Sequence, residues 1–193
     1  MTIRNDEKQI RSLQTQLQVR AKDSSDDLII EGYFIVFNRE TELFPGAFEE
    51  IAPEAITNLD GRDIRGLNNH DPQLVLGRTK SGTLTLRKDE KGLWGSIKIN
   101  PDDTDAVNLY QRVKRGDIDQ CSFGFDILKE DTEHRDDGSV KWTIREITLH
   151  EVSIVTFPAY ADTGVQARQK DKQRMIEMRK LKLKERLSNV KAT

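Results

Sequence analysis

A serine, a histidine and a His-Glu pair stand at the ends of apolar segments, where together they could carry out acyl transfer. Ser122 lies in Asp119–Phe125, where a hydroxyl interrupts residues typical of a buried strand. His70 follows one short apolar segment, and His150-Glu151 precedes another. Acyl transfer at neutral pH needs a nucleophile, a base that takes its proton and a third group that orients the base. The spacing permits this chemistry and leaves open whether His150 or Glu151 is the third group.

Each of these residues also has an ordinary structural interpretation. A strand serine commonly donates its hydroxyl to a neighbouring carbonyl, and the histidine of Asn-His-Asp-Pro is typical of a turn. Cys121 is a second candidate nucleophile, but side chains alternate along a strand, so Cys121 and Ser122 should point to opposite faces. The same alternation allows only one of His150 and Glu151 to face His70.

Alternating apolar residues predict about seven strands, which would position these candidates. The pattern favours three hairpins, the third closed by Asp137-Gly138, and it places His70 where a short strand meets a turn. The predicted strands comprise residues 17–21, 28–37, 64–68, 83–87, 92–99, 120–128 and 140–149, the last continuing through 150–157 to Pro158.

One helix is predicted between the second and third hairpins. Residues 100–104 supply capping side chains, an apolar face follows at Ala106, Leu109, Tyr110 and Val113, and Gly116 ends the segment. Many strands with few helices predict a mainly β fold with flanking helices (α+β), arranged as an antiparallel barrel or sandwich.

Three stretches have weaker patterns. Residues 1–15 are polar, with Ile10 and Leu13 at helical spacing, and we expect a short helix or an irregular lead-in. Residues 40–53 contain Pro45-Gly46 and are predicted to form an irregular loop. A short helix is predicted over residues 53–59, with Pro53 in its first turn.

Composition narrows the class of protein. No apolar segment is long enough to span a membrane, and the N-terminus lacks the apolar segment of a signal peptide. The single cysteine excludes an internal disulfide framework and is typical of an intracellular protein. With one cysteine and three histidines, a structural zinc site is improbable. Residues 166–193 carry a net charge of +7 and residues 1–165 a net charge of −9. This basic tail contains no aromatic residue, which argues against nucleic-acid binding.

Five blocks of sequence, in order over about residues 15–165, resemble the caudovirus prohead protease family. The later blocks are Cys121-Ser122-Phe123-Gly124-Phe125 and Leu149–Val155 running into Pro158-Ala159-Tyr160. The earlier blocks are Glu31-Gly32-Tyr33-Phe34-Ile35-Val36-Phe37-Asn38, Phe48-Glu49-Glu50-Ile51-Ala52-Pro53, and Leu67-Asn68-Asn69-His70-Asp71 with Leu76-Gly77-Arg78.

The resemblance implies a serine endopeptidase that acts inside the phage procapsid, within the host cell. Its implied substrates are the scaffold, the scaffolding segment of the major capsid protein, and its own chain, with self-association. No metal or cofactor is implied. By position, Ser122 would be the nucleophile, His70 the general base and Glu151 the third member, in preference to His150, because a carboxylate better offsets the charge of imidazolium.

The resemblance also implies a fold similar to that of herpesvirus assembly proteases, a β-barrel with flanking helices. We therefore expect an N-terminal extension (1–15), a serine protease domain (16–165) and a basic, helical or flexible tail (166–193). Two alternatives stay open: a non-catalytic capsid or tail assembly protein with the same fold, and a cysteine peptidase that uses Cys121.

Overall fold

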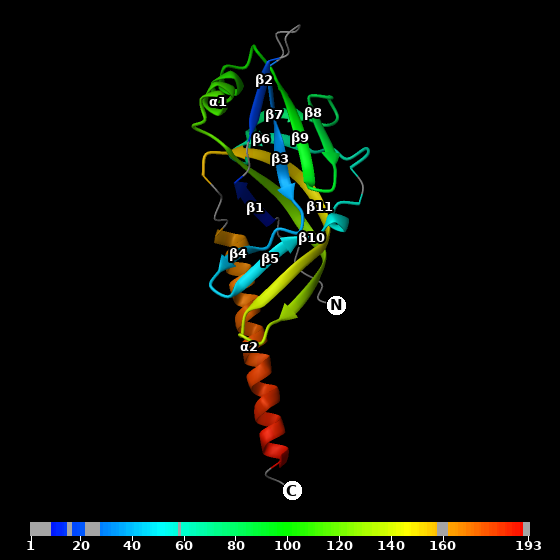
Figure 1. The fold of residues 1–193 in the computed structure, drawn as a ribbon, viewed down its shortest axis with the longest axis vertical. Helices are drawn as coiled ribbons and strands as arrows, with labels where there is room; N and C mark the ends of the chain where they lie inside the picture. Colours follow the sequence, from blue (N-terminus) through cyan, green and yellow to red (C-terminus); the bar gives the residue numbers. More distant parts are fainter. Residues whose placement is uncertain (1–8, 15–16, 22–27, 58, 158–161, 191–193) are drawn as a thin grey trace. The chain divides into compact units, whose positions relative to one another are not determined.

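The fold comes from a computed structural model, which describes residues 9–14, 17–21, 28–57, 59–157 and 162–190 (Figure 1). The chain divides into two compact units, Met1–Tyr160 and Ala161–Thr193. The first unit contains all eleven described strands and the helix α1 (Thr104–Arg115), and the second contains the helix α2 (Asp162–Val190). Each unit is described separately below.

The larger sheet of the first unit has seven strands and holds every candidate residue. Its order is β1-β10-β11-β5-β4, with β6 also paired to β11 and β7 paired to β6. Most pairs are antiparallel, but β11 runs parallel to both β5 and β6. The strands are β1 (Gln9–Gln14), β4 (Thr41–Phe44), β5 (Ala47–Ile51), β6 (Arg65–Asn68), β7 (Asp71–Arg78), β10 (Gln120–His134) and β11 (Val140–Val155).

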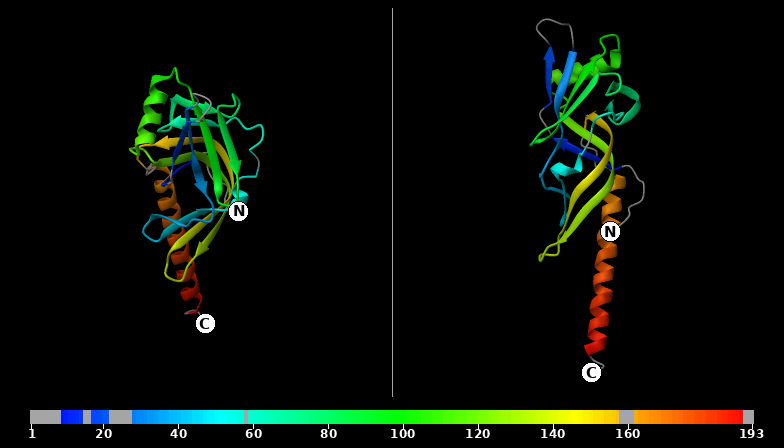
Figure 2. Two further views of the ribbon diagram at one scale, coloured as in Figure 1. Left: turned by 45° about the horizontal axis from the view of Figure 1, so that its top comes forward. Right: turned by 90° about the vertical axis from the view of Figure 1, so that its right-hand side faces the viewer.

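The smaller sheet has four antiparallel strands in the order β2-β3-β9-β8. They are β2 (Gln18–Ala21), β3 (Leu28–Val36), β8 (Leu84–Lys88) and β9 (Gly92–Ile99). Side chains from both sheets and from α1 form one hydrophobic core, which includes Phe34, Ile97, Leu109, Cys121 and Phe125. Figure 2 shows the β10–β11 hairpin, light green to yellow, as a long twisted ribbon that extends well beyond the shorter strands.

The helix α1 forms as its sequence predicts. The Asp103 carboxylate accepts hydrogen bonds from the backbone amides of Asp105 and Ala106, which satisfies donors that the first turn leaves unpaired. At the other end Gly116 adopts φ of 85°, the left-handed conformation that ends many helices. The predicted apolar face, Ala106, Leu109, Tyr110 and Val113, is the buried one.

The prediction of a mainly β fold with flanking helices is confirmed, but its details need correction. The predicted number of strands was too small, since the described residues form eleven. The predicted antiparallel pairing holds for most strands, but the larger sheet is mixed, because long connections bring β5 and β6 alongside β11 in parallel. A closed barrel stays a prediction, since the strands are grouped into two separate sheets.

Short strands account for the errors. Residues 40–53, predicted to be a loop, form the β4–β5 hairpin around Pro45-Gly46, followed by a single turn of 3₁₀-helix at Pro53–Ala55 in place of the longer helix. Residues 9–14, predicted to be a helix or an irregular lead-in, form β1 against β10. In both cases pairing with a neighbouring strand overrides a weak local pattern.

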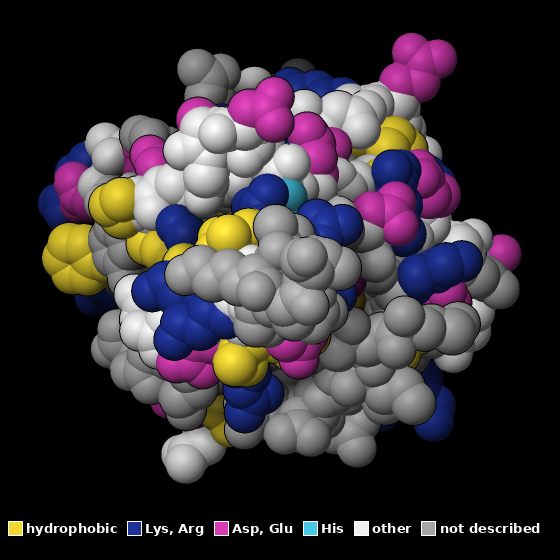
Figure 3. Space-filling view, turned by 90° about the horizontal axis from the view of Figure 1, so that it is seen from below, with side chains coloured by type: hydrophobic (Ala, Val, Ile, Leu, Met, Phe, Trp, Pro, Cys, Tyr) yellow, Lys and Arg dark blue, Asp and Glu magenta, His cyan; other side chains and the backbone are white. Residues whose placement is uncertain are grey.

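The second unit is dominated by α2, a helix of 29 residues. Several of its large apolar side chains are exposed: Ile176, Met178, Leu181, Leu183 and Leu187. Among the described residues no helix is apolar enough over a sufficient length to cross a membrane. Side chains of Lys and Arg and side chains of Asp and Glu both appear on the face drawn in Figure 3.

Candidate active site

His70 occupies a two-residue turn in an unusual backbone conformation. The turn joins β6 to β7, with Asn68 opposite Asp71, and both central residues have positive φ: 51° at Asn69 and 62° at His70. Such a turn matches the twist of paired strands, but its second position strongly favours glycine. A histidine there costs about 1 kcal/mol or more, and residues held in this way are concentrated at functional sites.

Asn69 ties this turn to the end of β11. Its backbone amide donates to the carbonyl of Ile154 at 2.9 Å. Its side-chain Oδ1 accepts from the backbone amide of Thr156, also at 2.9 Å. With the turn fixed at two points, the position of the neighbouring His70 relative to β11 is fixed as well.

Glu151 of β11 holds the His70 ring in one orientation. His70 Nδ1 lies 2.8 Å from Glu151 Oε1, so Nδ1 carries the proton when Glu151 is ionised. The other oxygen of Glu151 accepts a hydrogen bond from Ser153 Oγ at 2.6 Å. The side chains are 14% exposed for His70 and 4% for Glu151. His70 Nε2 is buried and has no hydrogen-bond partner among the described residues, so its lone pair is available to accept a proton.

Ser122 is fully buried on β10, beside the same part of β11. In the register of the two strands Ser122 lies opposite Ser153, and Gly124 lies opposite Glu151. Opposite residues of an antiparallel pair project to the same face, so Ser122, Ser153 and Glu151 share one face of the sheet. Gly124 contributes no side chain to that face.

The hydroxyl of Ser122 is hydrogen-bonded to β1. It donates to the carbonyl oxygen of Arg11 at 2.9 Å and accepts from Ser12 Oγ at 3.1 Å. No hydrogen bond joins Ser122 to His70, which lies at the end of β6 on the other side of β11. The structure therefore brings His70 and Glu151 together. Ser122 lies on the strand next to that of Glu151, and β11 separates it from His70.

The two alternative candidates point elsewhere, as strand alternation predicts. Cys121 is fully buried in the hydrophobic core, on the face opposite Ser122. His150 contacts Asp126, with 2.6 Å between Nε2 and Oδ2, and its side chain is 40% exposed. Of the pair His150-Glu151, only Glu151 contacts His70.

The comparison with known families is decisive for the class of protein. The sequence profile of the caudovirus prohead serine protease family matches residues 15–178. The chain belongs to this family of serine peptidases. The prohead protease of Enterobacteria phage HK97 is 30% identical over 143 residues, which cover 72% of this chain. The chain spans 59% of the length of that relative.

A solved structure gives independent support for the fold. The structure of the bacteriophage T4 capsid assembly protease is similar, with a TM-score of 0.52 over 77% of this chain and 97% of the T4 chain. The two sequences are only 12% identical, so this similarity speaks for the fold alone.

Two contacts of the candidate residues were not predicted from the sequence. Ser153 supplies the second hydrogen bond to Glu151, and Ser12 contacts Ser122. The spacing Glu151-x-Ser153 on a strand could have indicated the first contact, since residues two apart share a face. The second depends on β1, which was not predicted to be a strand.

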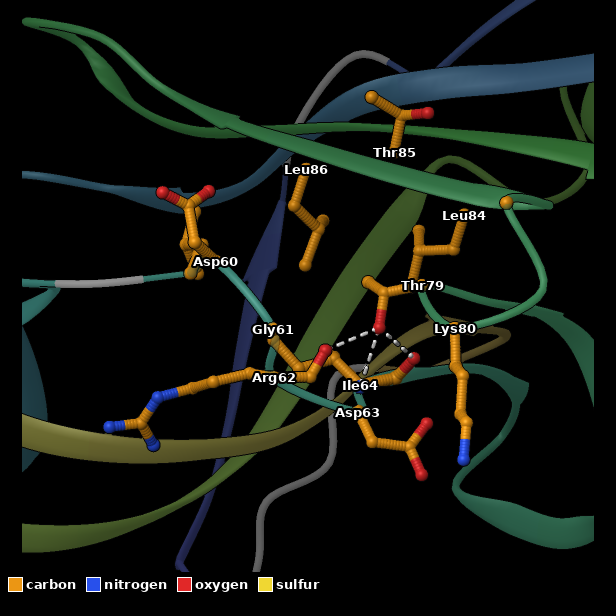
Figure 4. A pocket seen from close by; sticks show the side chains of 12 residues that line it. Asp60, Gly61, Arg62, Asp63, Ile64, Thr79, Lys80, Leu84, Thr85 and Leu86 are labelled. Carbon is orange, nitrogen blue, oxygen red and sulfur yellow. Dashed lines mark hydrogen bonds between the residues drawn. The ribbon is translucent and has the colours of Figure 1, made fainter.

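A separate surface pocket of about 530 Å³ lies near the start of the β6–β7 hairpin (Figure 4). Its lining includes Asp63, Thr79 and Leu86, but none of the candidate residues. The Thr79 hydroxyl donates to the carbonyl of Arg62 at 2.6 Å and accepts from the amide of Ile64 at 2.9 Å, which fixes the loop before β6. No cluster of His, Cys, Asp and Glu among the described residues could hold a metal ion.

Proposed function

We propose that this chain is a serine endopeptidase in which Ser122 is the nucleophile, His70 the general base and Glu151 the group that orients His70. One observation carries the proposal. His70 is bonded through Nδ1 to Glu151, which shares a sheet face with Ser122, and the buried Nε2 of His70 has no hydrogen-bond partner among the described residues. A neutral imidazole in this tautomer can accept a proton from a serine hydroxyl.

The proposed reaction proceeds through an acyl-enzyme. Ser122 Oγ attacks the carbonyl carbon of the substrate peptide bond while its proton passes to His70 Nε2. Glu151 stabilises the imidazolium that forms, and His70 then donates the proton to the leaving amine. Water hydrolyses the ester and regenerates Ser122. Backbone amides near Gly124 are proposed donors to the oxyanion, and the other candidate segment, after Phe157, lies outside the described residues.

The relatives suggest the substrates. One is named a prohead protease and the other a capsid assembly protease. We therefore propose that this chain removes the scaffold, or the scaffolding segment of the major capsid protein, and acts on its own chain inside the phage procapsid in the host cell. We further propose that it self-associates and that its sheets follow the barrel of herpesvirus assembly proteases.

The direct test is co-expression with the capsid protein of the same phage, followed by mass spectrometry of the products. Ser122→Ala should lower cleavage by about 1,000-fold or more, because the nucleophile is lost. Cys121→Ala is the matched control: it changes the adjacent residue of the same strand, on the core face, and should leave cleavage within about threefold if the fold is intact. If Cys121→Ala abolishes cleavage and Ser122→Ala does not, the enzyme is a cysteine peptidase.

A second candidate function is that of a non-catalytic assembly protein, and the complete burial of Ser122 favours it. In that case wild-type protein supports capsid assembly without cleaving either chain, and Ser122→Ala behaves as the wild type. Absence of any cleavage in the presence of assembled capsids would therefore reject the peptidase.

A further inference from the structure

The strand β1 occupies the position that an extended substrate would take on the strand of the proposed nucleophile. It lies at the end of the larger sheet and pairs antiparallel with β10, from Gln9 opposite Phe125 to Gln14 opposite Gln120. Many proteins bind extended peptides by adding them to a sheet edge in this way. The sequence of β1 predicts no strand, so β10 provides the template that orders it.

The carbonyl oxygen of the peptide bond between Arg11 and Ser12 accepts a hydrogen bond from the Ser122 hydroxyl. Ser122 Oγ is 2.9 Å from the carbonyl oxygen of Arg11 and 3.1 Å from Ser12 Oγ. Among the carbonyl groups of β1, it is that of Arg11 to which the hydroxyl donates. A serine nucleophile must approach the carbonyl of the bond that it cleaves, so Arg11 would stand immediately before the cleaved bond and Ser12 immediately after it.

The Arg11 side chain fills a buried site on the opposite face of β1. Its Nε and Nη2 donate to Oε1 and Oε2 of Glu49, at 2.5 and 3.0 Å. The guanidinium also lies 5.8 Å from the centre of the Phe125 ring. The side chains are 11% exposed for Arg11 and 4% for Glu49. A two-point contact between guanidinium and carboxylate, closed off from water, discriminates strongly for a basic side chain.

A buried carboxylate explains why the site would be selective. Removing an ionised carboxylate from water is costly unless a cation or several donors compensate for it. A neutral or acidic side chain placed against Glu49 and Phe125 would not offer that charge. Lysine could supply the charge without the paired geometry, and it should therefore be accepted less well than arginine.

We infer that Glu49, with Phe125, forms the subsite that selects a basic residue immediately before the cleaved bond, and that Arg11–Ser12 is a self-cleavage site held in this position. The inference rests on the proposed peptidase function. Ser122 Oγ would form an ester with the Arg11 carbonyl as the bond to the Ser12 nitrogen breaks, and the proton from Ser122 would pass through His70 to that nitrogen. Water would then release residues 1–11 with a free carboxylate and leave a new N-terminus at Ser12.

The same geometry implies a latent state. While β1 is paired with β10, Ser122 is fully buried and no other substrate can reach it. Cleavage after Arg11 would cut the strand in two, and the products would hold the edge of β10 less firmly than the intact strand does. Self-cleavage would therefore precede the processing of other proteins.

The test follows the N-terminus of the full chain during co-expression with the capsid protein, by mass spectrometry. Wild-type chain should acquire a terminus at Ser12. Arg11→Gln should reduce this self-cleavage by about 100-fold or more, with Arg11→Lys retaining part of it. The wild-type enzyme should prefer a peptide with Arg immediately before the cleaved bond to one with Gln at that position. Glu49→Gln should reduce this preference by at least about tenfold.

Glu50→Gln is the matched control for Glu49→Gln. Glu50 is the next residue of β5, and its carboxylate contacts Lys141 at 2.9 Å on the other side of the strand. The control removes one charge and one ion pair from the same strand, and it should leave the peptide preference unchanged. Thermal unfolding of both variants, measured in parallel, separates a loss of fold from a loss of selectivity.

The outcomes separate this inference from the proposed function. If the capsid protein is cleaved while Arg11–Ser12 stays intact, or if Glu49→Gln preserves the preference for arginine, the subsite assignment is wrong and the peptidase stands. If no chain is cleaved at all, the peptidase fails and the self-cleavage site fails with it.

Discussion

Two histidines near the same segment of β11 contact carboxylates at similar distances, yet their surroundings differ. His70 Nδ1 is 2.8 Å from Glu151, and His150 Nε2 is 2.6 Å from Asp126. The first pair is 14% and 4% exposed, whereas the second is 40% and 34% exposed. His70 also has positive φ and a buried Nε2 without a partner among the described residues.

The comparison shows that a contact between histidine and carboxylate does not by itself identify a site. An exposed pair is screened by water and adds little to stability. A buried pair demands further hydrogen bonds, and Glu151 obtains one from Ser153. Strain in the backbone, burial of the pair and an unused ring nitrogen together support the proposal that His70 is the functional histidine.

The strongest test of this contrast replaces each histidine by glutamine. His70→Gln removes the proposed base and should lower kcat/KM for cleavage by about 1,000-fold or more. His150→Gln removes a partly exposed imidazole and should change kcat/KM by less than about threefold. Initial rates on one peptide substrate, with folding checked by circular dichroism, measure both. Comparable losses in the two variants would remove the distinction between the pairs.

The carboxylates should show the same contrast with a smaller effect. Glu151→Gln keeps an oxygen that can accept from His70 Nδ1, but it loses the negative charge that stabilises imidazolium. We expect kcat to fall by about 100-fold or more. Asp126→Asn, the matched amide substitution in the exposed pair, should leave kcat within about threefold. Rates at saturating substrate measure kcat for both variants. A larger loss of kcat in Asp126→Asn than in Glu151→Gln would contradict the proposal.

Ser153 should have an intermediate effect, because it acts on Glu151 and not on the substrate. Ser153→Ala removes one donor from Glu151 Oε2, and kcat should fall by about tenfold with KM little changed. Ser153→Thr keeps the hydroxyl and should recover most of the rate. A rise in KM with kcat intact would instead mean that Ser153 contacts the substrate.

Local sequence patterns predicted the elements that depend on neighbouring residues. The helix α1 has its caps and its apolar face in the sequence itself, and the hairpins β2–β3, β8–β9 and β10–β11 follow from alternating side chains and their turns. Alternation also separated Ser122 from Cys121, and Glu151 from His150, before any distance was known.

The parts of the fold and of the candidate site that the sequence did not predict depend on contacts between distant segments. Nothing near Gln9–Gln14 indicates a strand, because β1 is ordered by β10, more than 100 residues away in the sequence. The partner of Arg11 is likewise Glu49, on a strand that was predicted to be a loop. Such contacts are tertiary, and they override weak local propensity. The oxyanion donors stay a prediction for the same reason.

The smallest expected effect concerns a third charged pair, on the hairpin that carries His70. Arg78 donates two hydrogen bonds of 2.6 Å to Asp63, and this contact lowers the pKa of Asp63 to about 2. A carboxylate with a lowered pKa in the folded state stabilises the fold above its unfolded pKa of about 3.9, and this contribution is lost as pH falls from about 4 towards 2.

Asp63→Asn should therefore remove a small part of the acid sensitivity of the fold without affecting catalysis at neutral pH. Because the pair is partly exposed, water and salt screen it, and the change in melting temperature should be small. Thermal melts of wild type and variant between pH 2 and 5 would measure the difference, which should shrink as pH falls. A loss of cleavage in Asp63→Asn at neutral pH would show that this exposed pair, unlike His150 and Asp126, helps to hold His70 in place.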